Sequence, residues 1–120
     1  MSATGLEVFD KTIQTTHIWL QEIMEDLGDD RQVAWHSLGA VLHALRDRLP
    51  ADLSAHLGAE LPLLVRGLYY DQYQPTKQPD VTRSIETFLE RVKEGLVNIR
   101  PVDSLDATRS VFRVLAHHID

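Results

Sequence analysis

The sequence predicts an all-α fold, a compact bundle of five to six helices. Apolar residues recur every three or four positions along most of the chain, which is the period of one helix face. Glycine and proline are few, at six and five residues. No segment shows the alternation of apolar and polar residues that is typical of a half-buried strand. The 120 residues suffice for a single domain that buries a core without disulfides or metal ions.

The first two helices form a predicted hairpin. An apolar stripe runs from Leu6 to Leu27 and includes Phe9, Ile13, Leu20 and Met24. Gly28 then stands where a helix C-cap is expected, and Asp29 or Asp30 can cap the next helix. That second helix ends at Pro50, and its inward positions are Ala34, Leu38, Val41, Leu42, Leu45 and Leu49.

Three further helical segments follow. After a short helical turn over residues 52–56, Pro62 starts a third main helix with Leu61, Leu64, Val65 and Leu68 inward. Two prolines mark residues 74–80 as a linker, so the single domain over 1–120 divides into a first half (5–73) and a second half (81–120). Ser84 and Asp103 are the predicted caps of the last two helices. The apolar stripe of the first of these helices consists of Ile85, Phe88, Leu89, Val92 and Leu96. The stripe of the second consists of Leu105, Phe112, Leu115 and Ile119, with Val111 and Val114 beside it.

The two halves resemble duplicated helical hairpins. WLQEIMEDL (19–27) aligns with FLERVKEGL (88–96), and four extra residues in the second turn bring the next helices into register. The matched positions include both helix caps and both apolar stripes, which favours an internal repeat. Independent convergence on two amphipathic hairpins is the alternative. The matched pairs in the second helices are Asp30 and Asp103, Ala34 and Ala107, Ser37 and Ser110, Val41 and Val114, and Leu42 and Leu115.

Charge and composition exclude several classes of function. The formal charge is −6, and the excess lies in residues 1–60, which carry ten acids and four bases. A net acidic chain repels phosphate backbones, so we expect no nucleic acid as partner. There is no cysteine, which excludes thiolate metal sites and cysteine nucleophiles and suits a reducing cytoplasm. Neither a signal peptide nor an apolar segment of about 20 residues is present, so we expect no membrane association.

Residues 34–75 read AWHSLGAVLHALRDRLPADLSAHLGAELPLLVRGLYYDQYQP and carry a set of ordered motifs. These are the helix around Trp35 that ends in 45–50 (LRDRLP), the restart at Leu61 and Pro62, and the aromatic run over 69–75 before a proline loop. With them the chain resembles the bacterial family known as domain of unknown function 2267, from about Phe9 to Ile119. Tyr73 stands where that family leads us to expect tryptophan. The resemblance implies a compact helical domain in the bacterial cytoplasm, and it supplies no catalytic residues.

Asp52, His56 and Glu60 are candidate metal ligands. Their i, i+4, i+8 spacing would align three ligand-bearing side chains if one helix ran through all of them. Gly58 inside this window and Pro62 after it favour the alternative, in which the three residues supply a helix cap and surface charge pairs.

Two features are typical of a protein-interaction surface. Ile18 falls opposite the Leu20 stripe among polar residues, and three tyrosines, Tyr69, Tyr70 and Tyr73, crowd the end of the third main helix. Aromatic anchors at a rigid helix end are common at interfaces. The alternative is that both features pack within the domain, under the linker or against the second hairpin.

A basic ridge lies on the last helix at Arg109, Arg113 and His117. Cations are favourable near a helix C-terminus, and that alone can account for the ridge. It can also face the acidic first half, either within the chain or across a dimer. The sequence leaves both arrangements open.

No catalytic constellation is present. The chain has no glycine-rich phosphate loop, HExxH, Glu-x-x-His pair or G-x-S-x-G elbow, so an enzyme is disfavoured and no cofactor is expected. The sequence therefore favours a non-enzymatic helical interaction domain that binds a protein partner or forms a homo-oligomer. The alternative is a small-ligand or metal-binding helical protein with its site between the two hairpins.

Overall fold

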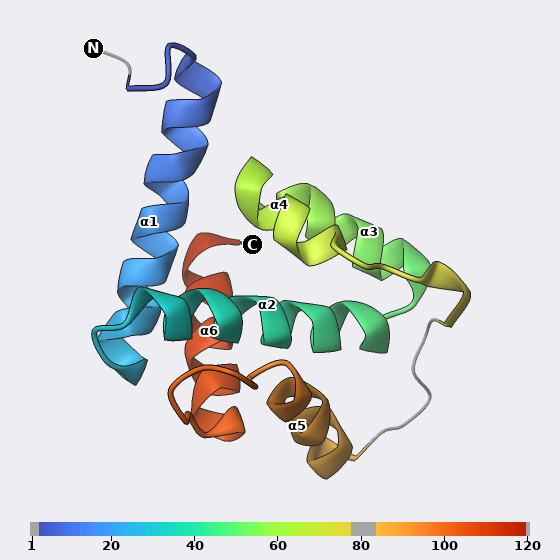
Figure 1. Cartoon of the computed structure of the whole chain (residues 1–120). Helices are drawn as coiled ribbons and strands as arrows, with labels where there is room; N and C mark the ends of the chain where they lie inside the picture. Colours follow the sequence, from blue (N-terminus) through green and yellow to red (C-terminus); the bar gives the residue numbers. More distant parts are fainter. Residues whose placement is uncertain (1–2, 78–83, 120) are drawn as a thin grey trace.

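A computed structural model describes residues 3–77 and 84–119 (Figure 1). These residues form α-helices, one short 3-10 turn at Pro75–Lys77 and no strand, which confirms the predicted all-α bundle. Of the predicted linker 74–80, residues 78–80 lie outside the described part. The helices are α1 Glu7–Leu27, α2 Arg31–Arg48, α3 Ala51–Glu60, α4 Leu63–Tyr70, α5 Ile85–Glu94 and α6 Ser104–His118.

Side-chain caps start three of these helices at the predicted residues. The Asp30 carboxylate accepts hydrogen bonds from the backbone N–H groups of residues 32 and 33, at 2.9 and 3.3 Å. Ser84 caps α5 and Asp103 caps α6 in the same manner. Gly28 ends α1 with a φ of +109°, a conformation that side chains other than glycine's rarely adopt. The local signals for these helix ends are therefore sufficient to place them.

Helix α2 is the centre of the bundle (Figure 1). It packs against α1, α4, α5 and α6, and residues around most of its circumference are buried. Leu38, Val41 and Leu42 are completely inaccessible to solvent. Burial of each of these side chains contributes about 1.5–3 kcal/mol to folding. These four helices are thus held by a shared contact with α2.

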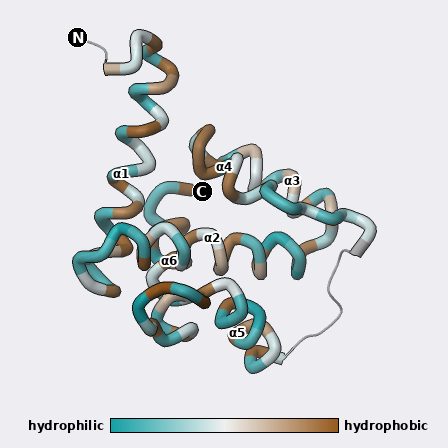
Figure 2. The backbone as a smooth tube through the Cα atoms, in the orientation of Figure 1, coloured by the Kyte–Doolittle hydropathy of each residue, from teal (hydrophilic) through white to brown (hydrophobic). Residues whose placement is uncertain are grey.

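The apolar stripe of α1 is covered over only part of its length. Its buried residues begin at Thr16, whereas Leu6, Phe9 and Ile13 are 52, 47 and 39 % exposed. The prediction that these three residues face the core is therefore wrong. The reason is visible in Figure 1, where the N-terminal half of α1 extends beyond α2 and α6. Figure 2 shows hydrophobic residues along this projecting N-terminal half of α1.

In the last two helices the buried stripe is also narrower than predicted. Val111 and Val114 are fully buried, while Phe112 is 42 % exposed and Ile85 is 64 % exposed. The buried face of α6 is centred on Val111 and Val114, because this face meets both α1 and α2.

The packing of the hairpins is symmetrical. Helix α1 contacts α2 of its own hairpin and α6 of the other, and α5 contacts α6 of its own hairpin and α2 of the other. Exchange of the two hairpins leaves this set of contacts unchanged. That is the arrangement expected of two duplicated hairpins packed around an approximate two-fold axis.

The two hairpins differ in the hydrogen bonding of one matched serine. Ser110 of α6 donates a hydrogen bond of 2.7 Å to the Asp26 carboxylate of α1. In the sequence alignment Ser37 matches Ser110 and Gly95 matches Asp26. Within the described residues the buried Ser37 hydroxyl has no hydrogen-bond partner, since the matching glycine has no side chain to accept from it. Glycine at the position matched to Asp26 thus accounts for the unpaired hydroxyl.

This comparison predicts opposite effects of one substitution at two matched sites. Ser37→Ala removes an unpaired buried hydroxyl and is expected to leave the free energy of unfolding unchanged or to raise it by up to about 1 kcal/mol. Ser110→Ala removes a hydrogen bond to a carboxylate and is expected to lower it by about 1 kcal/mol. Urea denaturation of both variants measures the difference. A loss at Ser37 as large as that at Ser110 contradicts the explanation.

Candidate functional site

The tyrosine cluster belongs largely to the core. Tyr69 is completely buried, and its hydroxyl donates a 2.8 Å hydrogen bond to the Ser54 carbonyl and lies 2.8 Å from the Ser54 hydroxyl. Burial raises the pKa of this phenol. The prediction that Tyr69 forms part of an exposed surface is therefore wrong, because α3 covers it. Tyr70 packs edge-on against Tyr69, with ring centroids 5.0 Å apart, and Tyr73 packs on Tyr70 at 5.7 Å.

Arg46 of α2 fixes the end of α4. It is 5 % exposed and donates hydrogen bonds of 2.8 and 2.9 Å to the carbonyls of Tyr69 and Asp71. Its guanidinium also lies 5.1 Å from the ring centroid of Tyr73 and pairs with Asp47, which in turn pairs with Arg91 of α5. Tyr70 and Tyr73 are half-buried beside these contacts.

The metal candidates on α3 lie on one continuous helix. Gly58 does not interrupt it: the glycine is buried against the ring of Tyr70, whose hydroxyl would lie 2.4 Å from an added Cβ. The expectation that this glycine breaks the helix is therefore wrong. Asp52, His56 and Glu60 are all exposed. The ligand atoms of these three residues do not all lie within 4.8 Å of one another. Among the described residues, one other triad meets that criterion.

That triad lies between α1 and α6. Glu22 accepts from His117 at 2.8 Å through Oε1 and from His118 at 2.7 Å through Oε2. Partial burial tends to raise the pKa of Glu22, but the contacts with both histidines lower it overall. The sequence contains an acidic first half and a basic ridge on the last helix, but not the register that brings Glu22 to His117 and His118.

The basic ridge pairs with the acidic first hairpin within the chain. Arg113 lies 2.9 Å from the Asp26 carboxylate and donates a 2.8 Å hydrogen bond to the backbone carbonyl of Glu22. Of the two arrangements that the sequence left open, the structure has the intramolecular one for Arg113 and His117. Arg109 is exposed and lines a small hollow beside Asp26 and Asp106.

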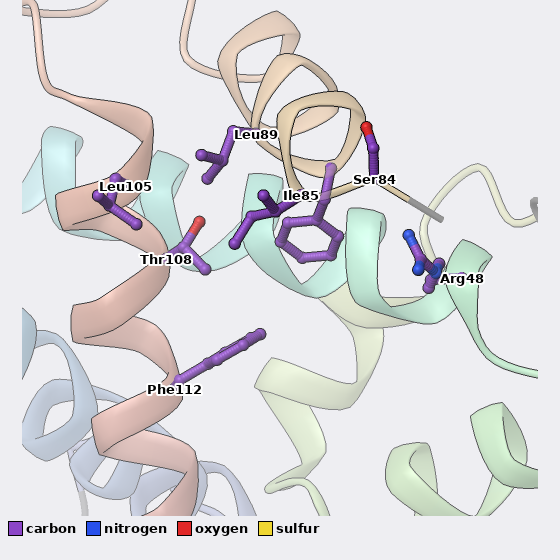
Figure 3. Close-up of a pocket in the computed structure, with 8 residues that line it drawn as sticks. Arg48, Ser84, Ile85, Leu89, Leu105, Thr108 and Phe112 are labelled. Atoms are coloured by element: carbon purple, nitrogen blue, oxygen red, sulfur yellow. The ribbon is translucent and has the colours of Figure 1, made fainter. Parts of the chain in front are cut away.

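An apolar groove opens between α5 and α6, the two helices of the second hairpin (Figure 3). Its walls come from α5 and α6, and Arg48 of α2 lies at one end. The volume of the groove is about 240 Å³, and the ring centroids of Phe88 and Phe112, which both line it, are 6.2 Å apart. Most of these residues belong to the apolar stripes predicted for the last two helices, and periodicity alone does not distinguish a core from an open groove. The lining also includes Ser84, Ile85, Leu89, Leu105 and Thr108.

Ile18 is 47 % exposed on α1 and points away from the stripe that contains Leu20. No helix among the described residues is long and apolar enough to cross a membrane.

The family described as "Uncharacterized conserved protein (DUF2267)" matches residues 16–120. The chain belongs to the DUF2267 family. The comparison with curated proteins gives no match. In this DUF2267 protein the match begins at Thr16, the first buried residue of α1, so the projecting N-terminal half of that helix lies outside the matched range. The family description assigns no activity, and the side chains must therefore carry any functional argument.

The α1–α6 contact of this DUF2267 protein predicts a pH dependence of stability. The hydrogen bond from Ser110 has the largest effect on the pKa of the Asp26 carboxyl and lowers it. Partial burial raises this pKa and Arg113 lowers it, so the pKa in the folded protein is below its ordinary value. The ionised form is therefore favoured by folding. This contribution is present above the unfolded-state pKa of about 3.9 and is lost as the pH falls through the folded-state pKa.

We therefore expect Asp26→Asn to lower the free energy of unfolding at pH 7, and the difference from wild type to shrink at pH 3. Because the Asp26 side chain is 37 % exposed, solvent screening limits the effect to no more than about 1 kcal/mol. Urea denaturation at both pH values measures it, with Asp29→Asn as the exposed control. A difference that is independent of pH contradicts the argument.

Proposed function

We propose that this domain is a non-enzymatic protein-interaction module that self-associates through an apolar surface on α1 and α4. The α1–α4 surface consists of Leu6, Phe9 and Ile13 of the projecting half of α1 and Leu63 and Leu64 at the start of α4. The observation that carries the proposal is the continuity of the α1 stripe, which runs without a break from the buried core onto this exposed half.

Contacts between the two helices hold this surface together. The backbone N–H of Leu64 donates a 3.0 Å hydrogen bond to the hydroxyl of Thr12, in the middle of the projecting half of α1. Leu63 and Leu64 are 51 and 42 % exposed at this point. This hydrogen bond brings the start of α4 to the projecting half of α1, and in the proposal the exposed apolar residues of the two helices act as one patch.

The projecting half of α1 would gain burial from a partner. The buried residues of α1 begin at Thr16, and Phe9 and Ile13 are 47 and 39 % exposed. A partner that covers Phe9 and Ile13 would bury their apolar area, and full burial of such a side chain contributes about 1.5–3 kcal/mol.

A second copy of the chain is the partner we propose. Two copies related by a two-fold axis can each cover the other's surface, because such an interface uses the same patch twice. The net negative charge and the absence of cysteine are compatible with a protein partner in the cytoplasm, which is the proposed compartment, rather than with nucleic acid.

The groove of Figure 3 supports a second candidate, the binding of a small amphipathic ligand. Its apolar walls would take a hydrocarbon or aromatic body, and Arg48 would pair with an anionic end. Its volume of about 240 Å³ is below the 300–1,000 Å³ typical of ligand pockets, which makes it the weaker candidate.

Sedimentation-velocity measurements over a concentration series test the self-association. Wild type is expected to form dimers, and Phe9→Glu and Ile13→Glu are each expected to weaken the dimer more than about tenfold, because a charge would be placed in the buried patch. Ile18→Glu is the matched control, since Ile18 is as exposed as Phe9, at 47 %, but lies on another face of the same helix.

Circular dichroism of each variant controls for loss of helix. A wild-type chain that stays monomeric at millimolar concentration contradicts the proposal. Dissociation by Ile18→Glu, with no effect of Phe9→Glu, would place the interface on the opposite face of α1 and contradict it as well.

A further inference from the structure

Three ligand-bearing side chains converge where the C-terminal end of α6 meets the middle of α1. The Oε atoms of Glu22, Nδ1 of His117 and Nε2 of His118 supply ligand atoms that all lie within 4.8 Å of one another. Two of the ligands are consecutive residues, and the third is 95 positions away from His117. The fold brings this set together through the packing of α1 on α6.

The donor set fits a borderline divalent transition metal. Two imidazole nitrogens and one carboxylate are the three protein ligands of several zinc sites, in which water occupies the fourth position. Imidazole and carboxylate are poor ligands for soft monovalent copper, and Mg²⁺ and Ca²⁺ prefer oxygen throughout. Among common ions, Zn²⁺ therefore matches this combination best.

The present distances require little movement. The carboxylate oxygens lie 2.8 Å from Nδ1 of His117 and 2.7 Å from Nε2 of His118. Zinc bonds of about 2.0–2.1 Å in a tetrahedron separate neighbouring ligand atoms by about 3.3 Å. An ion could thus replace the two hydrogen bonds if each pair opened by about half an ångström.

Neighbouring contacts orient the ligands. The ring of His118 stacks on Trp19, with centroids 5.2 Å apart and planes 18° apart, and Trp19 is only 1 % exposed. The Glu22 side chain is 14 % exposed, and Arg113 holds its backbone carbonyl. Such outer contacts fix side-chain direction before an ion binds and strengthen its binding.

The electrostatic setting also favours a cation. His117 and His118 occupy the last turn of α6, where unpaired carbonyl groups give the helix a partial negative charge. The exposed side chain of His117, at 63 %, leaves the site open to an ion from solvent. From this geometry we propose that Glu22, His117 and His118 form a Zn²⁺-binding site between the two hairpins.

Isothermal titration of the full chain with ZnCl₂ tests the proposal. Wild type is expected to bind one Zn²⁺ per chain, and His117→Ala and Glu22→Gln are each expected to lower the affinity more than about tenfold. His56→Ala is the matched control: it removes another exposed histidine, from the Asp52–His56–Glu60 set on α3, and should leave binding unchanged.

A second readout separates metal binding from loss of fold. Zn²⁺ should raise the Tm of wild type and of His56→Ala but not of His117→Ala, whose exposed ring can be removed without opening the core. Absence of saturable binding in wild type would overturn the proposal. Binding that survives both His117→Ala and Glu22→Gln, or that is lost in His56→Ala, would overturn it too.

Discussion

The enclosure of α2 by four other helices constrains the rest of the structure. Because little of this helix meets water, its buried side chains must be apolar or have their polar atoms paired within the protein, and among the described residues only the Ser37 hydroxyl lacks such a partner. His43 and Arg46 satisfy this requirement with backbone carbonyls of α4 and the turn after it: Nε2 of His43 lies 2.7 Å from the Leu68 carbonyl, and Arg46 donates to Tyr69 and Asp71. The polar groups of the central helix thereby determine where α4 ends.

The position of α4 in turn determines what remains uncovered. Its C-terminal end is held by α2, and its first turn is held by Thr12 of α1. Both ends being fixed, the helix presents Leu63 and Leu64 beside the projecting half of α1. The α1–α4 surface is therefore part of a rigid framework, and rigidity lowers the entropy lost when a partner binds.

Local features of the fold could be read from the sequence, and long-range ones could not. The caps at Asp30, Ser84 and Asp103 depend on residues two or three positions away, so a short window contains all the information. The burial of Tyr69 under Ser54 depends on how α3 and α4 fold back on each other. The same holds for Glu22 and His117, whose helices meet only in the assembled bundle.

Helical periodicity also did not show which apolar residues are exposed. A stripe such as that of α1 states which side of a helix avoids water, but not how far along its axis a neighbour extends. Phe9 and Ile13 lie on the same stripe as Leu20, yet they are 47 and 39 % exposed. The groove around Phe88 and Phe112 escaped prediction for the same reason.

The close approach of α5 to α2 at Gly95 has a consequence for how the molecule can vary. A Cβ at position 95 would come within 2.7 Å of the Ala40 Cβ, so this junction is sealed by backbone contact and tolerates almost no added volume. At the matched junction of α1 with α6, Asp26 and Arg113 are 37 and 47 % exposed and pair at 2.9 Å. The α2–α5 junction therefore limits variation by volume, whereas the α1–α6 junction depends on polar contacts that solvent can reach.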